Sequence, residues 1–130
     1  MGREEAVAVR LAEDSRGGSR YLWSLQPGAR LDVTSPTSLL QVDWQRPHYC
    51  LVAGGIGITP LLGAAQALTR RGADVSLHYA VRSRHEAAYV EELAALLGDR
   101  LTVYAADEQQ RLDLGRLFNG LSNGATVLFC

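Results

Sequence analysis

A strand that runs straight into a glycine cluster, which then opens a helix, is the feature that most constrains how this 130-residue chain can fold. Residues 49–53 form a compact apolar strand, the Gly-Gly-Ile-Gly run at 54–57 ends it, and residues 58–71 place apolar side chains at helical spacing up to Gly72. Glycines at such a bend let the backbone approach a phosphate group, and the unpaired first amides of the helix attract an anion. Glycines used for packing alone are the alternative, and the adjoining strand, helix and Thr-Pro pair favour phosphate binding.

Strands and helices alternate from about residue 48 onward. After the first helix, the pattern predicts strands at 74–81, 101–105 and 125–130, and helices at 85–97 and within 112–121. Alternation of this kind implies parallel strand pairing, with helices on both faces of an open sheet. The fold class that we expect is therefore α/β.

The N-terminal third of the chain has a different rhythm. The sequence predicts strands at 6–11 and 30–34, a polar glycine-rich loop at 13–20, and a short helix at 21–25. A linker follows at residues 43–47. We therefore expect a domain boundary near Arg46, which divides the chain into one domain at 1–46 and a second at 47–130.

Charge and composition argue against several classes of function. The formal net charge of −1 provides no field that would draw the chain to nucleic acid or to a membrane surface. Its first residues do not form a signal peptide, and no apolar run is long enough to span a bilayer. The two cysteines and three histidines lack the spacing of metal ligands, so we expect no metal site. Cysteines as far apart as Cys50 and Cys130 fit reduced thiols in the cytoplasm.

The glycine run departs from the usual dinucleotide-binding fingerprint. Gly55 and Gly57 match its first two glycines, but Pro60 occupies the third position. No acid ends the second strand to bind a ribose hydroxyl, and the triplet Arg82-Ser83-Arg84 stands there instead. A standard Rossmann dehydrogenase is therefore disfavoured, while the arginines suit either a phosphate group or a solvated basic turn.

Through the stretch Gly54-Gly-Ile-Gly-Ile-Thr-Pro60, the sequence resembles the ferredoxin–NADP reductase superfamily, and within it the group of phthalate dioxygenase reductase and vanillate O-demethylase reductase. Residues 15–22 look like the flavin-phosphate loop of that group. Residues 77–83 look like its second nucleotide-domain strand, and residues 126–130 look like the strand that leads into its Cys-Gly-Pro motif. The resemblance covers nearly the whole chain.

This resemblance implies the end of a flavin-binding β-barrel at residues 1–46, followed by an NAD(P)-binding domain that is incomplete at its C-terminus. It also implies that NADH or NADPH passes a hydride to FMN or FAD, and that electrons then reach the iron–sulfur centre of an aromatic-ring oxygenase or demethylase system. The family's Arg-x-Tyr-Ser motif and cysteine-rich 2Fe–2S domain are missing, and Ser38 stands where the group usually has Asn. A nucleotide-binding module without turnover is therefore the alternative.

The resemblance implies that the flavin phosphate binds at Gly17, Gly18 and Ser19, with Arg16 or Arg20 nearby. Taken without the resemblance, this segment reads as a solvated loop with a serine cap. The expected partners are a flavin, a nicotinamide dinucleotide and an iron–sulfur or oxygenase component. Because unpaired strand edges promote association, we also expect another chain to cover residues 6–34.

The resemblance likewise assigns the dinucleotide site and the catalytic residues. The residues expected to bind the dinucleotide are Gly54, Gly55, Gly57, Ile58, Thr59, Pro60, Arg82, Ser83 and Arg84. Two residues would lie beside the reacting rings: Thr59, near flavin and nicotinamide, and Cys130, near the nicotinamide. Alternatively, Thr59 is a first-turn cap and Cys130 a strand thiol.

Overall fold

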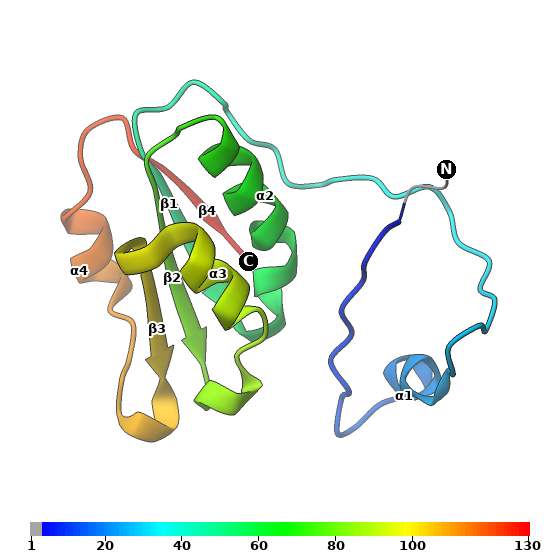
Figure 1. The fold of residues 1–130 in the computed structure, drawn as a ribbon. Coiled ribbons are helices and arrows are strands. Elements are labelled where there is room, and N and C mark those ends of the chain that lie inside the picture. The colour runs from blue at the N-terminus through cyan, green and yellow to red at the C-terminus, as the bar shows by residue number, and fades with distance from the viewer. Residues whose placement is uncertain (1–3) are drawn as a thin grey trace. The chain divides into compact units, whose positions relative to one another are not determined.

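The computed structural model describes residues 4–130, and the chain divides into one compact unit that ends at Gln41 and a second that spans Val42–Cys130 (Figure 1). The sequence pattern predicts this division a few residues later, near Arg46.

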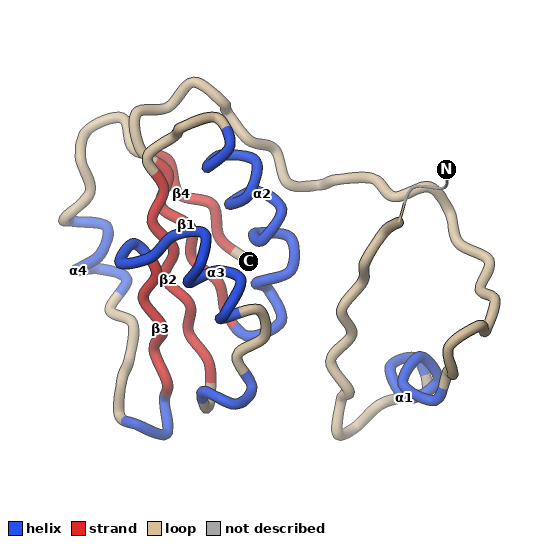
Figure 2. The backbone as a smooth tube through the Cα atoms, viewed as in Figure 1, coloured by secondary structure: helices blue, strands red, loops and turns tan. Residues whose placement is uncertain are grey.

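In the first unit, helix α1 (Gly18–Ser24) is the only helix or strand among residues 4–41. It starts earlier than the predicted helix at 21–25, because the Ser15 hydroxyl accepts hydrogen bonds from the amides of Gly17 and Arg20 and so caps the start of the helix. The predicted strands at 6–11 and 30–34 are wrong, and both segments are loops (Figure 2). A strand requires a hydrogen-bonded neighbour, and among the described residues none pairs with these segments.

The second unit is built on a four-stranded sheet with the order β3-β2-β1-β4, and every pair in it is parallel. The strands are β1 (Tyr49–Gly54), β2 (Val75–Val81), β3 (Leu101–Ala105) and β4 (Thr126–Phe129). The helices between them are α2 (Ile58–Arg70), α3 (Val90–Leu97) and α4 (Leu114–Asn119). The predicted alternation and the α/β fold class are confirmed.

The connections of the sheet determine which face each helix covers. Helix α2 packs against β1 and β2, and α3 packs against β2 and β3, so both cover the same face (Figures 1 and 2). The connection from β3 to β4 passes back across the sheet in the opposite sense. Since parallel crossovers are right-handed, this reversal puts α4 on the other face. Helices therefore lie on both faces, as predicted.

The core lies between the sheet and the pair α2 and α3. Alternate residues of β2 are buried, as expected for a strand with one face against helices. The largest fully buried side chains of the sheet and helices are Tyr49, Leu51, Ile58, Leu61, Leu68, Leu77, Tyr79 and Leu93. Each buried leucine contributes about 1.5–3 kcal/mol through removal of its apolar surface from water. This packing holds the ends of β1 and β2 in fixed register.

Helix α3 is shorter than the predicted helix at 85–97. Tyr89 has a left-handed backbone with φ of 63°, and an α-helix cannot continue through that conformation. Residues Arg84–Glu86 form a separate single turn, closed by a 3.1 Å hydrogen bond from the Glu86 amide to the Ser83 carbonyl. The apolar periodicity extends over this segment, but the chain turns tightly after β2 before α3 begins.

A polar network crosses the other face of the sheet. The His78 ring lies 2.9 Å from the Tyr104 hydroxyl and stacks on its ring. His48 connects the Ser76 hydroxyl, at 3.2 Å, to the Asp74 carboxylate, at 3.0 Å. Burial lowers the pKa of His78, and the charge of His48 lowers it further. The folded protein therefore favours the neutral form of His78.

Because the unfolded chain titrates His78 near its ordinary pKa of about 6.5, the unfolded state binds protons more readily than the folded state below that pH. The stabilisation from neutral His78 is complete above this value and is lost as the pH falls toward the lower folded pKa. We expect His78→Gln to weaken this pH dependence, measured by urea unfolding at about pH 7.5 and about pH 5.5. The exposed His85, changed to Gln, is the matched control. If wild type and His78→Gln lost the same free energy of unfolding between about pH 7.5 and about pH 5.5, this account would be contradicted.

Candidate dinucleotide-binding turn

The carboxyl ends of the parallel strands meet at one edge of the sheet, where the glycine run lies. Strand β1 ends at Gly54, and one turn of 3-10 helix at Gly55–Gly57 leads directly into α2. Gly54 pairs with Ala80 of β2 on one side, and its amide donates a 2.8 Å hydrogen bond to the Cys130 carbonyl on the other. The structure thus brings the glycine run, the end of β2 and Cys130 to the same edge, where open α/β sheets bind ligands.

Gly57 is required by the close approach of Cys130. The Cys130 amide donates a 3.0 Å hydrogen bond to Val52, which extends the pairing of β1 and β4 by one residue. A Cβ atom on Gly57 would overlap the carbonyl group of Cys130. Gly57 therefore serves packing, and the Gly54 amide is used by the sheet. Packing, the alternative reading of the glycine run, accounts for Gly57, whereas a Cβ atom on Gly54 would make only an ordinary 3.9 Å contact with the Cys130 carbonyl oxygen.

Gly55 has a different environment. Its backbone has φ of 53°, and a Cβ atom built there would meet no protein atom within 4 Å. A side chain at this position would therefore point into open space, and its absence leaves room for a ligand beside the main chain. The bend leads into the first turn of α2, whose amides have no partner inside the helix. Of the three glycines, Gly55 is the one whose surroundings suit a phosphate.

The next residues of the run differ in their surroundings. The Thr59 hydroxyl donates a 3.2 Å hydrogen bond to the Ile56 carbonyl, and the start of α2 has no side-chain cap, so Thr59 is a first-turn threonine and not the helix cap. Ile58 is fully buried, and its side chain packs in the core rather than lining a site. Pro60 is exposed in the first turn of α2, where a missing amide hydrogen costs nothing.

The two arginines after β2 are in different states. Arg82 is exposed, and its side chain makes no hydrogen bond or ion pair with the described residues. The Arg84 guanidinium donates from Nε to both carboxylate oxygens of Glu108 at 3.0 Å, and from Nη2 to Gln110 at 2.9 Å. Sequence reasoning missed Glu108. The only signal was the polar loop after the third strand, which ends at the same edge of the sheet.

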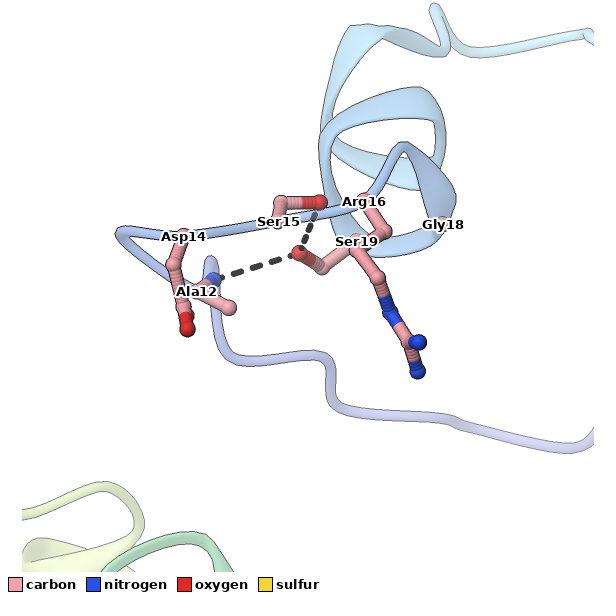
Figure 3. Close-up of a pocket in the computed structure, with 6 residues that line it drawn as sticks. All are labelled: Ala12, Asp14, Ser15, Arg16, Gly18 and Ser19. Carbon is pink, nitrogen blue, oxygen red and sulfur yellow. Dashed lines mark hydrogen bonds between the residues drawn. The ribbon is translucent and has the colours of Figure 1, made fainter.

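The proposed flavin-phosphate loop in the first unit surrounds an open hollow, which Figure 3 shows with Arg16 projecting beside it. Ser15 and Ser19 share a 3.0 Å hydrogen bond, and the Ser19 hydroxyl also accepts from the Ala12 amide. The hydroxyls and the Gly17 amide thus bond to one another in this state. The exposed guanidinium of Arg16 has no partner among the described residues and is open to an anion.

Both cysteines are free thiols, Cys50 in the core and Cys130 exposed. Burial raises the pKa of the Cys50 thiol, although a hydrogen bond with Ser76 opposes the change, so this thiol stays protonated and unreactive. Within residues 4–130, no group of three His, Cys, Asp or Glu side chains lies close enough to hold a metal ion. None of the described helices has both the length and the hydropathy to cross a membrane.

Comparison with known proteins identifies related chains. Residues 51–116 match the family of oxidoreductase NAD-binding domains. The chain is 46% identical to the beta subunit of heme-dependent oxidative N-demethylase from Ectopseudomonas mendocina, over 98% of this chain and 41% of that subunit. It is 43% identical to a reductase subunit of the toluene-4-sulfonate monooxygenase system from Comamonas testosteroni, over 79% of this chain and 33% of that subunit.

Among solved structures, full-length CYP116B46 from Tepidiphilus thermophilus superposes with a TM-score of 0.89 and 41% sequence identity. The match covers 94% of this chain and 16% of that protein. The present chain therefore spans less than half of the curated relatives named above and a smaller part of this structural neighbour.

The close approach of Cys130 gives a direct test of the turn. We expect Gly57→Ala to lower the free energy of unfolding by about 1–3 kcal/mol, the usual cost of overpacking. Gly63→Ala is the matched control, because Gly63 lies inside α2 with nothing near its missing Cβ. That change should raise the free energy of unfolding by about 0.5–1 kcal/mol. Urea unfolding of both variants measures the difference, and equal effects would show that Cys130 does not pack on the turn.

Proposed function

Because the chain belongs to the family of oxidoreductase NAD-binding domains, we propose that it binds NADH or NADPH at the carboxyl edge of its sheet. In the whole protein it would be the dinucleotide-binding part of a flavin-dependent reductase that supplies electrons to an oxygenase or demethylase component. The relatives named as subunits of N-demethylase and monooxygenase systems support this assignment.

The open bend at Gly55 is the observation that carries the proposal. A pyrophosphate needs main-chain amides that it can approach without meeting side chains, and a positive helix end. Gly55 supplies the first, because its missing Cβ leaves open space. The start of α2 at Ile58 supplies the second. The proposed pyrophosphate contacts are therefore amides of residues 55–59 other than that of Ile58, which already donates to the Gly55 and Ile56 carbonyls.

The proposed roles of Thr59 and Cys130 follow from their positions around the bend. Thr59 lies in the first turn of α2 and is partly exposed, so its side chain is near any ligand held there. Cys130 is exposed and bonded through its backbone to Gly54 and Val52, which fixes its place beside the bend. Neither residue has to act as an acid or base. We propose that both position the reacting ring of the dinucleotide.

Bound FMN or FAD would supply the hydride chemistry. The proposed contribution of residues 13–20 is electrostatic, because two arginines of this segment are exposed. Arg16 lines the hollow, and Arg20 follows Ser19, which also lines it. The electron acceptor, an iron–sulfur or oxygenase component, is proposed from the relatives alone. The free thiols support our further proposal that the protein works in the cytoplasm.

A second candidate is a module that binds the dinucleotide without turnover. The absence of strands in residues 4–41 favours it, because a flavin held by α1 and loops alone is poorly enclosed. Both candidates require the Gly55 bend to hold the dinucleotide, and they differ only in flavin retention.

Dinucleotide binding is tested by Gly55→Ala. The new methyl group enters the space proposed for phosphate, and we expect the affinity for NADH to fall by at least about tenfold, equivalent to about 1.4 kcal/mol. Gly72→Ala is the matched control: Gly72 also has a positive φ, of 72°, and open surroundings, but it precedes the amino end of β2. Both variants should lose about 1–2 kcal/mol of stability from the left-handed backbone. Equal calorimetric affinities for NADH in the two variants would refute the site.

Flavin binding is tested by Arg16→Ala. If the loop holds the flavin phosphate through this guanidinium, loss of the charge-assisted contact should weaken FMN binding by about tenfold. The control is Arg70→Ala, which removes the same charge from the exposed last turn of α2. Fluorescence quenching of added FMN and FAD measures the affinity. A chain that binds NADH but neither flavin supports the module without turnover.

A further inference from the structure

Glu108 lies where the chain leaves β3, at the same edge of the sheet as the glycine bend. Ala106–Glu108 form a single 3-10 turn directly after β3. The turn is fixed to the end of β2 by a 3.0 Å hydrogen bond from the Asp107 amide to the Arg82 carbonyl. A 3.1 Å hydrogen bond from the Gln110 amide to Ala105 closes the loop. The acid is therefore presented by a defined loop and not by a flexible one.

The contact of Glu108 with Arg84 is bifurcated, because one Nε–H of the guanidinium is shared between both carboxylate oxygens. Arg84 Nε lies 3.0 Å from both of its oxygens, and Nη2 is held 2.9 Å from the Gln110 side-chain oxygen. Arg84 and Glu108 retain 49% and 43% of their side-chain exposure, so both can still reach a ligand in solvent. Two neighbouring strands thus place one base and one acid together, and the charges of the pair cancel.

The end of the second strand is where dinucleotide folds distinguish their ligands. When the turn after the first strand holds the pyrophosphate, the adenosine ribose lies beside the end of the next strand. An acid there accepts a hydrogen bond from the ribose 2′-hydroxyl, whereas a free arginine accommodates a 2′-phosphate. The triplet at 82–84 contains arginines and no acid. In the structure an acid reaches the same place from the loop after β3.

We propose that Glu108 is a specificity-determining residue that selects NADH over NADPH, with Arg84 as the positioning residue that holds its carboxylate. This inference rests on the proposed dinucleotide site. A 2′-phosphate carries about 1.5 to 2 negative charges and would meet the Glu108 carboxylate. Arg84, the arginine beside that carboxylate, is already paired, so only Arg82 of the triplet keeps a free guanidinium among the described residues. A ribose 2′-hydroxyl carries no charge and can donate to the same carboxylate.

The experiment is calorimetric titration of the full 130-residue chain with NADH and with NADPH. We expect wild type to bind NADH about tenfold more tightly, since a half-exposed pair is screened by solvent and gives modest discrimination. Glu108→Gln keeps the size of the side chain, removes its charge and frees the Arg84 guanidinium. The ratio of the two affinities should therefore fall toward one, chiefly because NADPH binds more tightly.

Asp99→Asn is the matched control, because this substitution also removes one negative charge. Asp99 precedes the amino end of β3, at the opposite edge of the sheet. It should leave the ratio unchanged, and circular dichroism of each variant checks that it is folded. Equal affinities in wild type, preference for NADPH, or an unchanged ratio in Glu108→Gln would overturn the role of Glu108 while leaving the dinucleotide site intact. Binding of neither dinucleotide would overturn the site and this inference together.

Discussion

The pairing between the ends of β1 and β4 determines the geometry of the site. Cys130 donates to Val52 and accepts from Gly54, so β4 is held against β1 up to the residue where the glycine turn begins. This contact brings the Cys130 carbonyl against Gly57 and makes glycine necessary there. Gly55 lies outside this contact and faces open space. One backbone interaction thus separates a packing glycine from a glycine suited to a ligand, although the two stand two positions apart in the chain.

Much of the fold could be predicted from the sequence because local patterns and tertiary packing agree in the second unit. Residues 101–105 form a strand as predicted, and α2 follows the glycine run with nearly the expected bounds. The predicted strands at 6–11 and 30–34 failed because alternating residues show that a segment can pair, and not that a partner strand is present. The predicted start of α3 was wrong because the apolar periodicity does not indicate that Tyr89 has a left-handed backbone.

The candidate site was predicted in part, for similar reasons. Motif spacing located the glycine run and the arginines after β2, since each lies on a continuous stretch. It could not reveal that Arg84 is neutralised by Glu108, because the two residues lie in turns that follow different strands and meet only when β2 and β3 pair. The sequence shows which residues of the triplet are charged, but it does not show which residues pair with them. The sequence left NADH and NADPH open, and this pairing is the basis of our proposal that the ligand is NADH.

The contact between Gly57 and Cys130 also has a consequence for the order of folding. The two residues are separated by most of the second unit, and β4 can reach β1 only after a long intervening loop has been closed. Pairings of high sequence separation form slowly, since the chain loses entropy before the contacts compensate for it. We therefore expect the bend at residues 54–57 to acquire its final shape late, once β4 docks on β1. A domain in which β4 has not yet docked would hold the helix and its glycines without a finished binding surface, so ligand binding would report on the docking of β4.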